Sequence, residues 1–232
     1  GSGPTSGQFD TVILERPNSS ITVTLSNGIY NLRKLYVREA LDLTGGALTV
    51  NYVPAPDSTT NGARFSGPVS LSGSASFSVH TLQVDAAQTF ALNGGTLTLN
   101  TINLMPGATP AKLSIGGNLT INSLSNVTAV IAAGSGSGNS GFLDLTGNPR
   151  TLTIGNGTAE IDLVVNLALT NGALAKAGAG TLSLNAASTY AGGTTISAGR
   201  LIINNRTNSG TGLGSVAVIG GFLSGTGSIS GV

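Results

Sequence analysis

The sequence predicts an all-β protein, a β-solenoid of roughly ten coils, and three observations carry that prediction. A heptapeptide, Gly-Gly-x-Leu-Thr-[Val/Leu/Ile]-Asn, recurs, and its close and looser copies begin at residues 45, 94, 116, 179, 198 and 220. The intervals of 49, 22, 63, 19 and 22 residues lie near multiples of about 21–24, a period typical of a solenoid coil. Each copy alternates apolar and polar residues, and no segment shows the stripe of an amphipathic helix.

The copy at Gly94–Asn100 shows the physical basis of one coil. Leu97 and Leu99 are expected on one face of a strand, with Thr98 and Asn100 on the other. The preceding Gly-Gly supplies a turn in which a positive φ costs little. A short strand cannot bury its apolar face alone, so stacked coils must bury a continuous column of Leu, Ile and Val. We expect the asparagine to hydrogen-bond to an asparagine of the next coil or to close the corner.

The chain divides only weakly along its length. Residues 1–9 are predicted to be a flexible leader or an expression scar, and residues 10–232 a single β-solenoid domain. The segment Tyr30–Leu43 contains good helix formers but also alternates, and we predict a strand. Val53–Arg64, with two prolines, and the Gly/Ser-rich Gly134–Gly141 are predicted to be loops.

Composition excludes several classes of protein. Charged residues make up 8% of the chain, and ten Lys and Arg nearly balance nine Asp and Glu, so no polybasic surface is available for nucleic acid. The absence of cysteine excludes disulfides and cysteine metal sites. No apolar run reaches the roughly 18 residues of a membrane helix, so we do not expect a membrane-embedded protein. Low charge, abundant glycine and no cysteine also suit bacterial extracellular repeat proteins.

Few side chains could carry chemistry. His80 is the only histidine, and a structural or solvated role is expected because a zinc site would need further ligands. On a strand, Glu160 and Asp162 would share one face, as do the carboxylates that bind calcium or act as acid and base in β-helix lyases and hydrolases. No further carboxylate or basic residue accompanies them in this segment, so we interpret them as a solvated pair.

Other charged and glycine-rich segments have simpler interpretations. Glu39 and Asp42, beside Arg38 and Lys34, are expected to form an exposed ion-paired surface that contributes little stability. The glycine-rich strings lack the residues of a P-loop, a dinucleotide fingerprint or a nucleophile elbow. The sequence therefore predicts no catalytic, cofactor-binding or metal-binding residue, no cofactor and no enzyme.

The segment Lys176–Asn205, KAGAGTLSLNAASTYAGGTTISAGRLIINN, resembles the autotransporter-associated β-strand repeat, also called the passenger-associated transport repeat, of bacterial surface proteins. The similarity covers about 30 of the 232 residues, and Gly220–Gly231 resembles what often follows that repeat. The matching positions are Lys176, Gly178, Gly180, Thr181, Leu182, Leu184, Tyr190, Gly192, Gly193, Thr194, Thr195, Gly199, Arg200 and Leu201.

The resemblance implies a right-handed parallel β-helix, an extracellular or cell-surface location and a repeat that helps a passenger fold outside the cell. It implies no catalytic residue, because the matching Gly and Leu positions are structural in that family. The chain stops at Val232 in mid-pattern, so we expect a piece of a larger protein or a processed mature form.

Three functions remain open at this point. The first is a non-enzymatic structural segment (a stalk, passenger or fibre element) whose unpaired strand edges could associate end to end with copies of itself. The second is an adhesin or glycan-binding module with an extracellular polysaccharide as partner, although aromatic residues are only 4% of the chain. The third is a polysaccharide lyase or hydrolase that uses Glu160 and Asp162.

Overall fold

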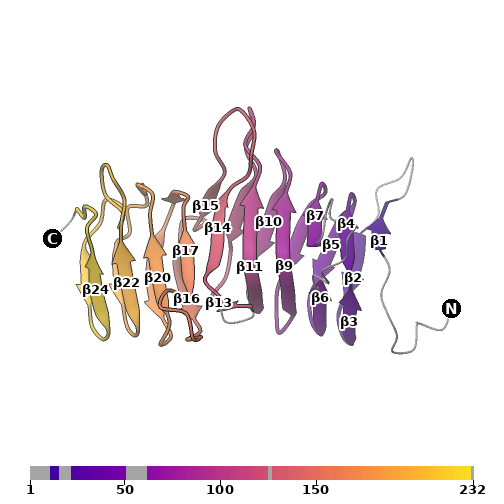
Figure 1. Ribbon diagram of the computed structural model, residues 1–232, viewed down its shortest axis with the longest axis horizontal. Coiled ribbons are helices and arrows are strands. Elements are labelled where there is room, and N and C mark those ends of the chain that lie inside the picture. The colour runs from indigo at the N-terminus through magenta and orange to yellow at the C-terminus, as the bar shows by residue number, and fades with distance from the viewer. Residues whose placement is uncertain (1–10, 16–21, 51–61, 125–126, 231–232) are drawn as a thin grey trace.

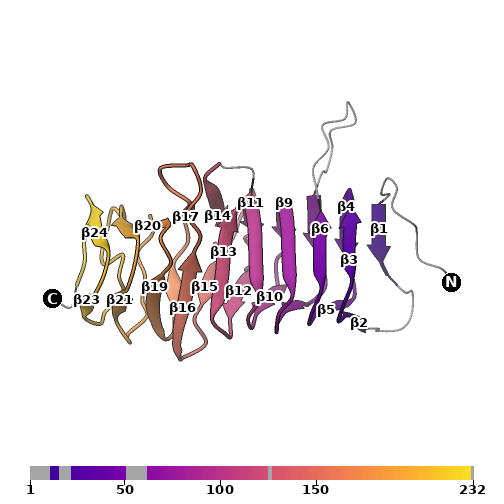
Figure 2. The same cartoon turned by 90° about the horizontal axis from the view of Figure 1, so that it is seen from below.

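The strands of the computed structural model pair in parallel, and no helix occurs in residues 11–15, 22–50, 62–124 and 127–230, which the structure describes. An isolated bridge between Gly107 and Asn139 is antiparallel. The chain coils into an elongated rod with β1 (Thr11–Leu14) and β24 (Phe222–Gly225) at opposite ends (Figures 1 and 2). The prediction of an all-β solenoid is confirmed. The predicted leader 1–9 and residues 53–61 of the predicted loop lie outside the described residues. The end of that loop was predicted wrongly, because residues 62–64 lie in β7 (Gly62–Phe65), where they pair with strands of both neighbouring coils.

The strands form three columns, each made of strands that pair between neighbouring coils. The first column contains β3 (Ile29–Leu32), β6 (Ala47–Val50), the first halves of β9 (Ser76–Val84) and β11 (Thr96–Leu104), β13 (Leu119–Ser123), β16 (Pro149–Ile154), β19 (Ala173–Ala177), β21 (Thr194–Ile196) and β23 (Val216–Val218). The second column contains β1, β4 (Lys34–Val37), β7 (Gly62–Phe65), the second halves of β9 and β11, β14 (Ala129–Ala133), β17 (Leu163–Val165), β20 (Thr181–Leu184), β22 (Arg200–Ile203) and β24. The third column contains β2 (Thr22–Leu25), β5 (Ala40–Leu43), β8 (Val69–Leu71), β10 (Thr89–Leu92), β12 (Lys112–Ile115), β15 (Phe142–Asp144) and β18 (Leu169–Thr170).

Coil length varies although the strands stay in register. Thr22 pairs with Ala40, 18 positions further on, whereas Ala129 pairs with Leu163, 34 positions further on. The difference is taken up in the corners, as in Gly134–Gly141 between β14 and β15. This segment is confirmed as a loop, and its β-structure is the isolated bridge at Asn139. The sequence intervals near multiples of 21–24 therefore describe an average and not a strict repeat.

The segment Tyr30–Leu43 is not one strand. It contains parts or all of β3, β4 and β5, one from each column, so the prediction of a strand was right in type and wrong in extent. The chain turns at Arg33 and again at Arg38–Glu39. Neither corner contains the glycine or proline that usually marks a turn in sequence, so the boundaries had no local signal.

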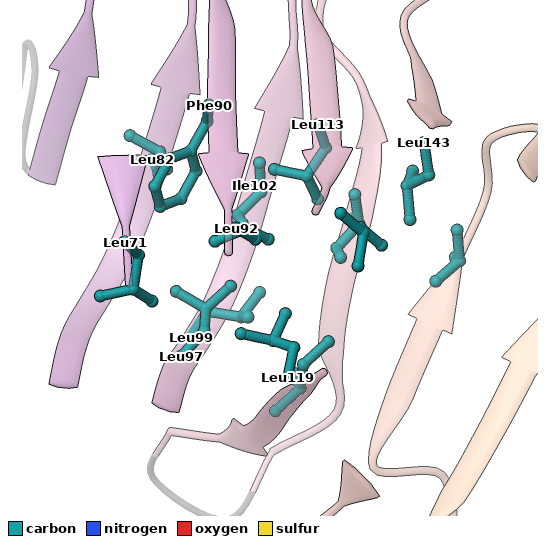
Figure 3. Packing of buried hydrophobic residues seen from close by; sticks show 14 of the residues in the cluster. Leu71, Leu82, Phe90, Leu92, Leu97, Leu99, Ile102, Leu113, Leu119 and Leu143 are labelled. Atoms are coloured by element: carbon teal, nitrogen blue, oxygen red, sulfur yellow. The ribbon is translucent and has the colours of Figure 1, made fainter. Parts of the chain in front are cut away.

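Alternating burial places the apolar residues inside the solenoid. Leu97 and Leu99 are buried, and Thr98 between them is not, as predicted. Figure 3 shows Leu71, Leu92 and Ile102 on the facing columns directed into the same interior space. Because each of these side chains is matched by one in the next coil, the buried residues form one continuous hydrophobic cluster along the rod.

Three phenylalanines, one from each column, meet in this interior. Phe65, Phe77 and Phe90 lie in β7, β9 and β10, and their ring centroids are 5.2–6.1 Å apart. Two of the contacts are edge-on and one is stacked, the arrangements that aromatic quadrupoles favour. The rings therefore fix the spacing of all three columns at one level of the rod.

The Gly-Gly turns are required by the close approach of successive coils. Gly46 and Gly95 have φ of 70° and 84°, and an added Cβ would lie 2.4 Å from a backbone carbonyl oxygen of the preceding coil at either position. A side chain is therefore excluded both by conformation and by space. This explains why the second glycine of the heptapeptide recurs.

Candidate functional site

The recognised repeat differs from the rest of the rod in what it buries. The third column ends at β18, and beyond it that side of the solenoid has no regular strand in the described residues. Tyr190 occupies the interior there, and its hydroxyl lies 2.6 Å from Thr194 Oγ1, which in turn donates to the carbonyl of Thr211 at 3.2 Å. Burial raises the pKa of Tyr190 to about 12, so the phenol stays protonated. Polar contacts inside the rod thus replace a missing strand.

Lys176 is buried in the same region with 0% of its surface exposed. It lies in β19 between Leu152 and Ile196 of the neighbouring coils, a position where other strands of the column carry apolar residues. Its Nζ donates to the carbonyl oxygens of Ala177 and Gly178, both at 2.9 Å, and of Ala198 at 3.1 Å. Burial lowers the pKa of Lys176 to about 8, while the charge of Asp162 acts in the opposite direction.

Asp162 and Glu160 do not form the solvated pair that the sequence suggested. Both residues precede β17, Glu160 is exposed, and Asp162 is buried with 1% exposure. The Asp162 carboxylate accepts hydrogen bonds from the backbone N–H of Gly157 at 2.6 Å and of Thr181 at 2.7 Å. Thr181 belongs to the next coil, so this carboxylate joins two coils. The shared face, on which a catalytic pair would depend, does not exist.

His80 lies on β9 where the chain passes from the first column to the second. Its ring Nδ1 is 3.2 Å from Thr81 Oγ1, and both residues are half-buried between the buried Val79 and Leu82. The alternation of buried and half-buried residues shifts by one position at His80, and again at Asn100 in β11, because each strand turns a corner there. This placement agrees with the structural or solvated role that the sequence favoured.

The prediction that Glu39 and Asp42 form an ion-paired surface with Arg38 and Lys34 is wrong for Arg38 and Asp42, whose recorded contacts lie outside that group. Arg38 pairs with Glu15 of the preceding coil, with Nη1 2.7 Å from Oε2, and Asp42 accepts a hydrogen bond from Ser70 of the next coil. The contacts thus run between coils and not between neighbours in sequence. Both partners of the ion pair are well exposed, so its contribution to stability remains small.

The predicted asparagine contacts between coils occur at one place in the repeat. Asn185 Nδ2 donates to Asn166 Oδ1 of the preceding coil at 2.8 Å, which confirms the prediction there. Asn100 makes no such contact through its carbonyl oxygen, because its buried Oδ1 has no hydrogen-bond partner in the part of the chain that the structure describes.

Two kinds of feature are absent from the described residues. They contain no helix long and apolar enough to cross a membrane. They also contain no group of three or more His, Cys, Asp or Glu side chains placed to hold a metal ion.

The sequence held a signal for Lys176 that alternation alone reveals. In Ala173–Ala177, the lysine follows the buried Leu174 by two positions and must share its inward face. Asp162 had no comparable signal, because it lies before its strand and its second partner is 19 residues away.

Comparison with known proteins adds two matches. Residues 174–203 match the model of the passenger-associated transport repeat family. A 92-residue part of the chain is 38% identical to a protein named Adhesin BmaC autotransporter, from Brucella suis biovar 1 (strain 1330). That match covers 38% of this chain and 3% of the adhesin, so the chain spans a small fraction of its relative. No solved structure matches the chain.

Proposed function

We propose that this chain, which carries a passenger-associated transport repeat, is a non-enzymatic structural segment of an extracellular bacterial surface protein. The observation that carries the proposal is the continuity of the repeat with the rod. Lys176 of the repeat pairs with Leu152 before it in the parallel ladder of the first column, and Arg200 pairs with Phe222 after it in that of the second column. The repeat therefore acts as one stretch of a stalk or passenger, and the name of the adhesin relative is consistent with a surface location.

The proposal includes a right-handed β-helix of roughly ten coils in a single domain, residues 10–232. The handedness is supported by the strong right-handed preference of connections between parallel strands. The coil number is supported by the second column, which supplies one strand to each coil from β1 to β24.

Labelling of intact cells tests the location. Antibodies raised against this chain are expected to label unpermeabilised cells of the producing bacterium, and external protease is expected to remove the signal. A cytoplasmic protein detected on the same samples is the control, since it must stay unlabelled and uncleaved. Signal that appears only after permeabilisation would contradict the proposal.

We further propose that the isolated chain associates end to end with a second copy. At the C-terminal end, Ile219 and Phe222 are 75% and 72% exposed beside the outermost strands β23 and β24. At the other end, an apolar cavity of about 160 Å³ is lined by Val12, Leu14, Val23, Leu25, Tyr30, Leu32, Leu35, Leu41 and Leu48. Both ends are cross-sections of one solenoid, so parallel pairing with a second copy would extend the same ladders and cover apolar surface.

Light scattering over a concentration series measures this association. The weight-average mass is expected to rise with concentration, and Phe222→Lys is expected to abolish the rise because a charge at the edge opposes strand addition. His80→Lys, on a side of the rod, is the control and should leave the rise intact. A constant monomer mass for the unmodified chain would overturn the proposal.

An adhesive role is the second candidate. It is favoured by the printed name of the relative and by a polar groove on the side of the rod, described below. A lyase or hydrolase centred on Glu160 and Asp162 is not proposed, because one carboxylate is exposed and the other is held by two backbone N–H groups.

A further inference from the structure

A shallow groove of about 140 Å³ lies on the outward face of the second column, across β4, β7, β9 and β11. Its lining residues are Tyr36, Gly62, Ala63, Arg64, Thr81, Gln83 and Asn103. Gly62 leaves the gap between its neighbours, with a φ of 121° and no room for a side chain, since an added Cβ would lie 2.0 Å from the carbonyl oxygen of Thr81. The hollow is therefore built into the backbone of this coil.

The polar lining is a ladder in strand register. Tyr36 pairs with Arg64, Arg64 with Gln83, and Gln83 with Asn103, so four successive coils present these side chains at the same level of the face. At strand spacing the ladder is about 14 Å long. It ends at the next coil, where Ala132 follows Asn103. A polymer lying along the rod would meet one polar group per coil.

The arginine of this ladder is held in place. Arg64 Nε lies 3.0 and 2.9 Å from the two carboxylate oxygens of Asp85, and Gln83 Nε2 donates to the same carboxylate at 2.7 Å. Burial raises the pKa of Asp85, but hydrogen bonds from Ser66, Gln83 and Arg64 outweigh it and leave that pKa below its usual value. Both hydrogen bonds recorded for Arg64 within the described residues come from Nε. Its two terminal nitrogens carry donors in the fork that suits a carboxylate.

We propose that this groove binds one carboxylate-bearing sugar ring of an extended extracellular polysaccharide. The ring packs on Tyr36 and its carboxylate meets the Arg64 guanidinium. The amides of Gln83 and Asn103, which lie on the next two coils, bond to hydroxyl groups of the adjoining units of the polysaccharide. The groove is smaller than the roughly 300–1,000 Å³ of a site that encloses a free small ligand, which favours one unit of a polymer. The proposal goes beyond the stalk function and does not depend on it.

Two other classes of macromolecule fit this face less well. A peptide that adds to a sheet needs an open strand edge, whereas β7 and β9 are each paired on both sides at this face. Nucleic acid needs a broad basic surface. The whole chain has a net charge of only +1, and the positive charge of Arg64 is paired with the negative charge of Asp85.

The test is a titration followed by amide NMR on the full chain. The probes are hyaluronan and polygalacturonate oligosaccharides, with uncharged chitin oligosaccharides for comparison. We expect shifts centred on Tyr36, Gly62–Arg64 and Gln83, a Kd of about 1 mM for at least one acidic probe, and weaker binding in high salt. Tyr36→Ala and Arg64→Ala are each expected to weaken binding at least about tenfold.

Matched variants separate the groove from general surface effects. Arg38→Ala removes a similarly exposed arginine that is also paired with a carboxylate, at 55% side-chain exposure against 48% for Arg64. Tyr30→Ala removes a tyrosine outside the groove. Both are expected to bind as the unmodified chain does. No shift in the groove with either acidic probe, shifts centred elsewhere, or equal binding of the uncharged probe would overturn the proposal. Cell labelling would still report on the stalk function by itself.

Discussion

Replacing Asp162 by alanine is expected to lower the free energy of unfolding by about 2–4 kcal/mol, because two hydrogen bonds to a charged acceptor are lost and each contributes about 1.5–3 kcal/mol at most. The variant leaves the partly buried N–H groups of Gly157 and Thr181 without their acceptor. It also removes the negative charge that raises the pKa of Lys176, so that pKa should fall further below about 8. The measurement is urea denaturation followed by far-UV circular dichroism, because the chain contains no tryptophan.

Two further variants define what the loss means. Glu160→Ala removes the exposed carboxylate two positions away and is expected to change stability by less than about 0.5 kcal/mol. Asp162→Asn keeps the shape of the side chain and one acceptor oxygen. Its loss of unfolding free energy should lie between the losses of Glu160→Ala and Asp162→Ala. If Asp162→Ala unfolded at the same urea concentration as Glu160→Ala, the structural role assigned to this carboxylate would be wrong.

The stability of the chain is expected to rise between pH 8 and pH 10, which is unusual for a protein. Folded Lys176 loses its proton near pH 8, whereas the unfolded chain keeps it until near its ordinary value of 10.5. Between these values the unfolded state binds more protons, so the free energy of unfolding increases with pH, by up to about 1.4 kcal/mol per pH unit. Below pH 8 both states are protonated and the gain is absent.

Tyr190 sets the upper limit of this rise. Its pKa is raised from 10.0 to about 12 in the folded state, so above pH 10 the unfolded chain releases a proton that the folded chain keeps. Stability then falls with further increase in pH, and the maximum should lie near pH 10.

Lysine variants assign the rise to one residue. Lys176→Met is expected to flatten the profile between pH 8 and pH 10 while lowering stability throughout, since the carbonyls of Ala177, Gly178 and Ala198 lose their donor. Lys112→Met, at a partly exposed lysine paired with Asp144, should retain the slope. The measurement is the urea midpoint of unfolding at each pH. If the midpoint of Lys176→Met still rose between pH 8 and pH 10, Lys176 would not be the cause of the rise.

The fold was accessible from the sequence because its signal is short-range and repeated. Alternation such as that at Leu97 and Leu99, and a glycine before the strand of each heptapeptide copy, recur often enough to indicate a solenoid without knowledge of any contact. The corners were not accessible in the same way. Arg33 and Arg38 turn the chain without a turn residue, because pairing with the coils on either side dictates where each strand ends.

The buried polar residues also differ in whether their positions could be predicted from the sequence. Burial of Lys176 follows from its place two positions after Leu174, an inference that the charge of the residue discourages. Burial of Asp162 depends on Thr181 in the next coil, and the groove at Gly62 depends on the register that brings Tyr36, Arg64 and Gln83 together. Such features are products of stacking, so they became visible only when the coils were placed.

The unequal coil steps, from 18 residues at Thr22 to 34 at Ala129, bear on how such a chain evolves. An insertion or deletion at a corner changes one turn and leaves the strand partners on either side aligned. Duplication or loss of a whole coil changes the length of the rod while its core composition stays the same. The surface loops and the length of the rod can therefore change in evolution with little effect on folding. For the same reason, a foreign loop could be grafted into Gly134–Gly141 without disturbing the strands.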